Sequence, residues 1–128
     1  MSKKILQVVK TAYRATIEEQ DDPVLWLSHV LKDLGSDVDV LLRGLAVNYA
    51  VTEQDAAGLS IGAWKQTHPP QLEKDLQTLI SKGCSVYLLQ EDAARLGLEQ
   101  RDLILGLKTS SYKELPDLYA NYDFIWAW

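Results

Sequence analysis

Cys84 is the only cysteine in this chain of 128 residues, and a lone thiol has two possible chemical uses. It could carry sulfur as a persulfide or take part in redox chemistry, provided that a cation or a helix N-terminus lowers its pKa. Cys84 instead comes directly after a segment that we expect to be a helix ending at Gly83, and the dipole at a helix C-terminus disfavours a thiolate. Cysteine also suits a buried position at the start of a strand. We therefore expect a structural role, with sulfur carriage by Cys84 as the alternative.

A second set of residues lies just after three segments that we expect to be strands. In open α/β sheets, ligands bind outside the carboxyl ends of the strands. The set combines cations, phenols, an amide and carboxylates, which suits a small-molecule pocket. The alternative is that these loop residues are polar because they face water. The candidate ligand-binding residues are Lys10, Tyr13, Arg14, Asn48, Tyr49, Gln90 and Glu91, and Asp92 continues the last polar run.

The chain lacks the common cofactor and metal motifs. No GxGxxG sequence follows the first expected strand, and no GxxxxGK[ST] phosphate loop is present. His29 and His68 have no metal-ligand spacing with each other or with Cys84. We expect no cofactor and no metal, and nothing in the sequence favours a hydrolase.

Composition places the chain among ordinary soluble domains. Hydrophobic residues make up 47% and charged residues 24%, which suits one domain spanning residues 1–128. The net charge of −5 and the scattered lysines and arginines argue against binding to nucleic acid. A single cysteine forms no internal disulfide, and no apolar run has the length of a signal peptide or a membrane span. We therefore expect a cytoplasmic protein that does not bind membranes.

Expected strands alternate with expected helices along the chain, which favours a mainly parallel sheet of five strands with helices on both faces. Residues 45–51 suggest a helical turn, and residues 54–66 receive no element. Apolar runs predict strands at 4–9, 38–42, 85–89, 103–107 and 124–128. Helical periodicity and capping signals predict helices at 23–34, from the prolines at 69–70 to Gly83, at 91–96 and at 112–119, with Pro116 limiting or kinking the last.

The aromatic run Phe124–Trp128 ends the last expected strand. A soluble monomer seldom leaves such an apolar segment exposed. The run therefore either packs inside the monomer or makes a contact between subunits.

The arrangement of these segments resembles the DsrE/DsrF/DsrH-like family, which includes the TusBCD sulfur-relay proteins. The similarity covers most of the chain and is closest in its second half. The closing tryptophan is similar to that of DsrH-type chains. The segments that carry the similarity are residues 4–9, 31–35, 38–42, 83–98, 111–115 and 123–128.

The resemblance implies a flavodoxin-like three-layer sandwich and assembly into trimers or hexamers. It also implies that DsrE-type members carry sulfane sulfur on a cysteine at the carboxyl end of the third strand. The matching position here is Leu89 or Gln90, and neither can hold sulfur. Cys84 lies at the opposite end of that strand, about 15 Å away at the usual rise of a strand.

Three hypotheses follow for the function. In the first, the protein is a non-catalytic, oligomeric DsrE-like subunit or accessory factor in sulfur trafficking, and its partners are copies of itself and sulfur-relay proteins. In the second, it is a sulfurtransferase that uses Cys84. In the third, it is a small-molecule binding module whose pocket lies at the strand ends.

Overall fold

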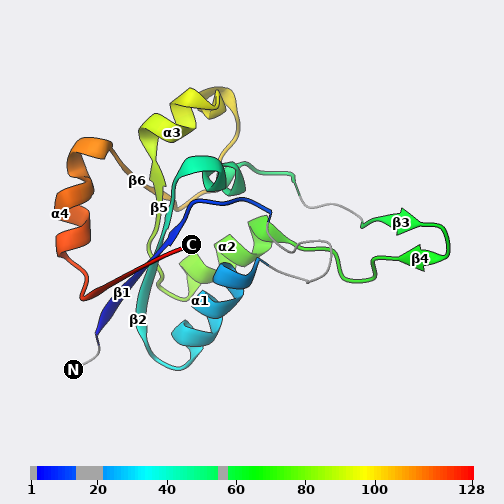
Figure 1. Ribbon diagram of the computed structural model, residues 1–128, viewed down its shortest axis with the longest axis horizontal. Coiled ribbons are helices and arrows are strands. Elements are labelled where there is room, and N and C mark those ends of the chain that lie inside the picture. The colour runs from blue at the N-terminus through cyan, green and yellow to red at the C-terminus, as the bar shows by residue number, and fades with distance from the viewer. Residues whose placement is uncertain (1–2, 14–21, 55–57) are drawn as a thin grey trace.

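The computed structural model describes residues 3–13, 22–54 and 58–128, and it confirms the expected α/β class. Five parallel strands form one sheet in the order β6-β5-β2-β1-β7, and helices cover both of its faces in a flavodoxin-like three-layer arrangement (Figure 1). The strands of this sheet are β1 (Lys4–Val9), β2 (Asp37–Leu42), β5 (Val86–Leu89), β6 (Lys108–Ser110) and β7 (Phe124–Ala127).

The central strands are apolar on both faces because each face packs on a core. One core contains Val9, Val40 and Val86 and lies against helices α1 (Pro23–Asp33) and α2 (Leu72–Ser81). The other contains Leu6, Leu41 and Leu89 and lies against helix α4 (Leu115–Ala120). Strands buried on both faces read as continuous apolar runs, which is why these strands were predictable.

Local signals in the sequence set the helix ends. Asp22 caps α1, because its Oδ1 accepts hydrogen bonds from the N–H groups of Val24 and Leu25, and Pro23 occupies the first helical position. The expected helix at 91–96 is α3 (Gln90–Arg95), and the helical turn expected near residue 45 is the 3₁₀ helix η1 (Gly44–Ala50). A further 3₁₀ helix, η2 (Leu98–Gln100), follows α3.

The strand expected at residues 103–107 was wrong. Leu103 makes only an isolated antiparallel bridge with Val51, and the sheet strand is β6, five residues further on. Ile104 is buried in the core, but Leu105 is 90% exposed and Gly106 has a φ of +92°, so this apolar run makes a turn instead of entering the sheet. The polar residues of β6 gave no strand signal because β6 lies at the edge of the sheet.

The helix expected at 112–119 forms in two parts. Ser111 caps the 3₁₀ helix η3 (Tyr112–Glu114), since its Oγ accepts a hydrogen bond from the Glu114 N–H. Helix α4 then begins at Leu115, and Pro116 lies in its first turn. Proline is tolerated there because the first N–H groups of a helix have no partner within it.

A small antiparallel hairpin lies outside the main sheet. It consists of β3 (Ser60–Ile61) and β4 (Trp64–Lys65), joined by Gly62 and Ala63, within the stretch to which the sequence assigned no element. Figure 1 shows it standing apart from the body on two extended segments.

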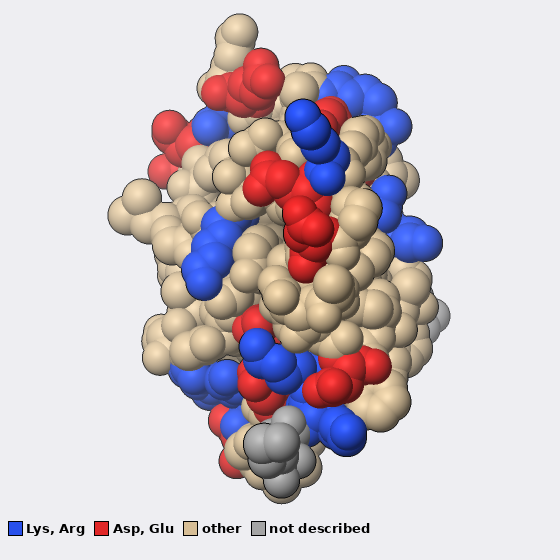
Figure 2. Space-filling model, turned by 90° about the vertical axis from the view of Figure 1, so that its left-hand side faces the viewer, with Lys and Arg blue, Asp and Glu red and all other residues tan. Residues whose placement is uncertain are grey.

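The surface carries charges of both signs. Figure 2 shows acidic and basic side chains interspersed over the face that it presents. No helix in the described part of the chain is long and apolar enough to cross a membrane.

Candidate functional site

The carboxyl ends of β1, β2 and β5 lie side by side, as the sequence predicted, because these strands are parallel neighbours. The loops that follow them are tied together. The backbone oxygen of Lys10, after β1, accepts a hydrogen bond from the Leu45 N–H, after β2. Gly44 has a φ of +58°, and a Cβ there would lie 3.0 Å from that same Lys10 oxygen. Glycine therefore permits both the turn and the close approach of the two loops.

Tyr13 and Tyr49 meet in a partly buried network of hydrogen bonds, in which Tyr13 is 45% exposed. The hydroxyl of Tyr49 accepts a hydrogen bond from the Tyr13 N–H at 2.6 Å and donates one to Asp22 Oδ2 at 2.5 Å. Tyr49 and Asp22 are fully buried, and the Tyr13 hydroxyl donates to Gln54 Oε1. Burial, reinforced by the hydrogen bond to Asp22, raises the pKa of Tyr49. This network joins the loop after β1 to the cap of α1 and to η1.

The remaining predicted residues are spread along the same edge. Lys10 is exposed, and Gln90 is exposed at the start of α3. The Asn48 side chain donates to the backbone oxygen of Leu45 within η1. Glu91 is exposed, and both of its carboxylate oxygens accept from the Tyr112 N–H at 3.1 Å. Arg14 lies outside the described residues.

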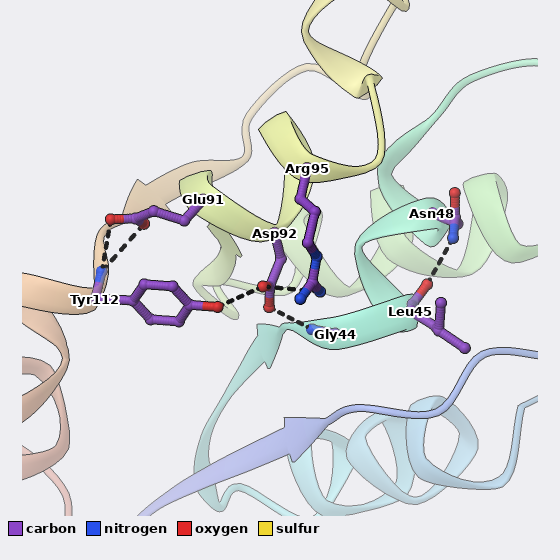
Figure 3. A network of polar contacts seen from close by, with 7 residues as sticks. All are labelled: Gly44, Leu45, Asn48, Glu91, Asp92, Arg95 and Tyr112. Carbon is purple, nitrogen blue, oxygen red and sulfur yellow. Dashed lines mark hydrogen bonds and ion pairs between the residues drawn. The ribbon is translucent and has the colours of Figure 1, made fainter.

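Asp92 is the centre of the polar contacts at this edge, and the prediction stopped one residue short of it. Its side chain is buried, and it accepts hydrogen bonds from the Gly44 N–H and the Tyr112 hydroxyl, both at 2.6 Å (Figure 3). Arg95, one turn further along α3, forms an ion pair with it at 3.1 Å. One carboxylate therefore joins the end of β2, helix α3 and the segment after β6. The feature of the sequence that could have identified Asp92 is its position in the polar run Gln90-Glu91-Asp92 after β5.

The charge of Asp92 is well stabilised. Burial alone would raise the pKa of this carboxyl group, but hydrogen bonds from Tyr112 and Gly44, together with the nearby Arg95 and Arg43, lower it. Asp92 is therefore an ionised acceptor with its contacts made, and it is poorly suited to act as a general base at neutral pH.

Two arginines lie near Asp92 at this edge, which also carries the exposed carboxylate of Glu91. The Arg43 guanidinium lies 6.0 Å from the centre of the Tyr112 ring and donates to the Tyr119 hydroxyl at 3.2 Å. Arg95 remains 61% exposed while it contacts Asp92. Guanidinium groups of this kind bind carboxylates and phosphates, so the arrangement can attract an anion. Within the described part of the chain, no group of three or more His, Cys, Asp or Glu side chains could hold a metal ion.

Cys84 lies at the other end of β5, two residues before the strand begins at Val86. It is 3% exposed, and its thiol contacts the backbone oxygen of Ser85 at 3.7 Å. Burial, and secondarily the negative charge of Asp39, raise its pKa to about 12. The thiol is therefore protonated at neutral pH, which is the opposite of what a nucleophilic cysteine needs.

Three solved structures share this fold across nearly their whole length. The YchN protein from E. coli matches with a TM-score of 0.75 and 18% identity, covering 98% of this chain and 99% of the other. The protein of unknown function MTH1491 from Methanobacterium thermoautotrophicum matches with a TM-score of 0.62 and 13% identity over 97% and 98% of the two chains. The conserved protein BT1422 from Bacteroides thetaiotaomicron, also of unknown function, matches with a TM-score of 0.64 and 12% identity over 98% and 95%.

At these identities the likeness shows the fold alone. The sequence matches no protein-family model and no curated protein.

Proposed function

We propose that this protein is a DsrE-like component of cytoplasmic sulfur trafficking that works as a non-catalytic, oligomeric subunit or accessory factor. It would act through contacts with copies of itself and with sulfur-relay proteins. The observation that carries this proposal is the composition of the two ends of β5. The carboxyl end, where the family resemblance expects the sulfur-carrying cysteine, has Leu89 and Gln90, and the one thiol of the chain is buried at the other end.

The contacts around Asp92 support the same conclusion. Leu89 is fully buried in the core beneath α4, so its position could not present a reactive group to solvent without rearrangement. The carboxylate that follows is engaged by Tyr112, Gly44 and Arg95. These residues hold the strand end together, which is a structural use of the position.

Sulfur carriage by Cys84 remains the alternative within the same pathway. It would require Cys84 to become exposed, because a persulfide forms when a thiolate attacks a sulfur atom of the donor. The burial of Cys84 and its pKa of about 12 weigh against this alternative.

A small-molecule binding module is a second candidate, and the two arginines beside Asp92 favour it. Arg43 and Arg95 stand with Tyr112 at the strand ends, where α/β sheets bind ligands. An anionic ligand that binds the native state should raise the melting temperature, and above its Kd the increase should grow with the logarithm of its concentration. An unchanged melting temperature across a panel of nucleotides and anionic metabolites would count against this candidate.

The main proposal is tested by mixing the protein with a DsrE-like subunit that has a cysteine after its third strand. Native mass spectrometry should show the protein as an oligomer alone and in a defined complex with that subunit. The rate at which the subunit passes sulfane sulfur to an acceptor thiol should change when the protein is added. A monomer that neither binds the subunit nor alters this rate would contradict the proposal.

A further inference from the structure

Gln7 is a fully buried polar residue in the middle of β1. Its side-chain oxygen, Oε1, accepts a hydrogen bond from the indole N–H of Trp128 at 2.8 Å. Its side-chain nitrogen, Nε2, is buried as well, and no acceptor within the described ranges 3–13, 22–54 and 58–128 bonds to it. A buried donor without an acceptor is costly, so the unpaired nitrogen of Gln7 needs an explanation.

The bond to Trp128 fixes the orientation of the Gln7 amide. An indole N–H donates a hydrogen bond and cannot accept one. The atom of Gln7 that faces Trp128 must therefore be the oxygen, because the nitrogen would place two donors against each other. Exchanging the two atoms would only remove the bond to Trp128. The unpaired group is thus an N–H donor, and its missing partner is an acceptor.

An apolar cavity of about 450 Å³ lies beside this amide, and we call it the tryptophan pocket. The described residues that line it are Leu27, Trp126, Ala127 and Trp128. Trp126 is the register partner of Gln7 across β7 and β1, so the two side chains rise from the same face of the sheet. Trp128 bonds to the amide itself. The Gln7 side chain therefore extends toward the aromatic wall of the pocket, and its amide lies directly behind that wall.

The tryptophan pocket lies at a point where sheets of this class bind ligands. Residues 126–128 are at the carboxyl end of β7. The strands β2, β5 and β6 follow on one side of β1, and β7 lies on its other side, so the strand order reverses between β1 and β7. Crevices outside the strand ends at such a reversal are the usual ligand sites of open α/β sheets. The volume also falls in the range of about 300–1,000 Å³ that is typical of small-molecule pockets.

This pocket is separate from the arginines beside Asp92. Leu27, which lines the pocket, belongs to α1. Arg43 instead contacts Tyr119 of α4, and Figure 1 shows α1 and α4 on opposite sides of the sheet. The two places would therefore bind different molecules.

The lining and the amide together define the chemistry of a ligand. The four lining residues are uncharged, and two of them are indoles, which favours a flat, uncharged aromatic molecule that packs against their rings. The unpaired N–H of Gln7 calls for an acceptor on that molecule, such as a ring nitrogen or a carbonyl oxygen. Trp126 is 37% exposed, so its ring can turn outward and admit the acceptor while Gln7 keeps its bond to Trp128.

We propose that the tryptophan pocket binds a flat, uncharged aromatic compound whose ring nitrogen or carbonyl oxygen accepts a hydrogen bond from Gln7 Nε2. In pockets of this kind, a few polar groups within an apolar lining fix the orientation of the ligand. This inference goes beyond the proposed function, because it involves neither self-association nor a relay protein.

The test compares quinoline with naphthalene, which has nearly the same shape but no acceptor. The full chain is titrated into a low, fixed concentration of either probe, and NMR measures the bound fraction. Gln7→Met retains the approximate length of the side chain and lacks the amide. It should weaken quinoline binding about fivefold, which is the usual net worth of one neutral hydrogen bond, and leave naphthalene binding unchanged. Comparing the two probes across both proteins cancels the difference in their hydrophobicity.

Two further variants locate the binding. Leu27→Arg should abolish binding of both probes, because it places a charge in the apolar lining. Leu105→Ser is the matched control, because Leu105 is 90% exposed and does not line the pocket. Circular dichroism and melting curves verify folding. Gln7→Met should fold, because it removes an unpaired buried donor, and Trp128 is 43% exposed, so its indole N–H can bond to water instead.

A measurement on the wild type keeps the test decisive if Gln7→Met unfolds. Quinoline should shift the NMR signal of a Gln7 side-chain amide proton downfield, because that proton enters a hydrogen bond, and naphthalene should not. Failure of both probes to bind, equal weakening of both by Gln7→Met, or quinoline binding that leaves the Gln7 amide and Trp126 indole signals unchanged would each overturn the inference.

Discussion

The two ends of β5 differ in what they offer to solvent, and this difference underlies the functional proposal. The amino end has the thiol of Cys84, but it is buried and has a pKa of about 12. The carboxyl end has exposed Gln90 and Glu91 next to the arginines, but no thiol. Reactive chemistry needs both a nucleophile and access, and each end of this strand supplies only one of them. We therefore infer that both ends of β5 have a structural role.

The largest expected effect is on the rate of thiol alkylation. Cys84 in the folded protein should react with iodoacetamide at pH 8 about a thousandfold more slowly than in denaturant, because a pKa near 12 leaves so little thiolate. Mass spectrometry over time measures both rates. Similar rates in the two states would show that Cys84 is accessible and would remove the contrast between the strand ends.

Moving the thiol to the other end should reverse this behaviour. In the double variant Cys84→Ser/Gln90→Cys, the new thiol lies on an exposed residue at the start of α3, so it should be alkylated at the rate of a free thiol. The single variant Cys84→Ser is the control for the lost native thiol. A slow reaction at position 90 would mean that this edge is closed to reagents.

Replacing the buried carboxylate should destabilise the carboxyl end. Asp92→Ala leaves the Gly44 N–H without its acceptor and removes the ion pair with Arg95, which should lower the free energy of unfolding by about 2 kcal/mol. Tyr112 is 45% exposed, so its hydroxyl can bond to water instead. Asp117→Ala, on the exposed face of α4, should have little effect in the same urea titration. Equal stability of the two variants would show that Asp92 is not a structural link.

The smallest effect concerns pH. The folded-state pKa of Asp92 is lowered, so its stabilising contribution is present above the unfolded-state pKa of about 3.9 and is lost as pH falls through the folded value. As pH falls from 5 to below the folded-state pKa of Asp92, the free energy of unfolding should therefore decrease more for the wild type than for Asp92→Ala. Tyr112→Phe removes one of the hydrogen bonds that lower the pKa of Asp92. The free energy of unfolding of this variant should therefore decrease less at acid pH than that of the wild type. If the free energy of unfolding depended on pH in the same way in all three proteins, Asp92 would not be the group that causes the loss at acid pH.

Much of the fold followed from local signals in the sequence. The buried strands were continuous apolar runs, and the Asp22-Pro23 pair marked the start of α1. The run at 103–107 was mistaken for a strand because apolar character does not distinguish a strand from a turn whose residue Ile104 packs in the core. The strand β6 is polar because it is a short edge strand. The hairpin escaped prediction because two residues per strand are too few to show a period.

The candidate site was predictable in place but not in its contacts. Parallel topology brings the strand ends together, so Tyr13, Tyr49 and Glu91 were found at one edge. Nothing local in the sequence shows that the Tyr49 hydroxyl turns inward to Asp22, or that Asp92 is the buried member of its polar run. Those outcomes depend on partners 20 to 48 residues away in the chain, which are specified only by the tertiary structure.

The central claim is that this chain carries no sulfur itself, and intact mass after incubation with a sulfane-sulfur donor tests it most directly. Wild type and Cys84→Ser should show no added sulfur atom, whereas Cys84→Ser/Gln90→Cys should gain one at the exposed end of the strand. The gain in the double variant would show that the donor is competent. A sulfur increment in the wild type that disappears in Cys84→Ser would make Cys84 a carrier and contradict the account.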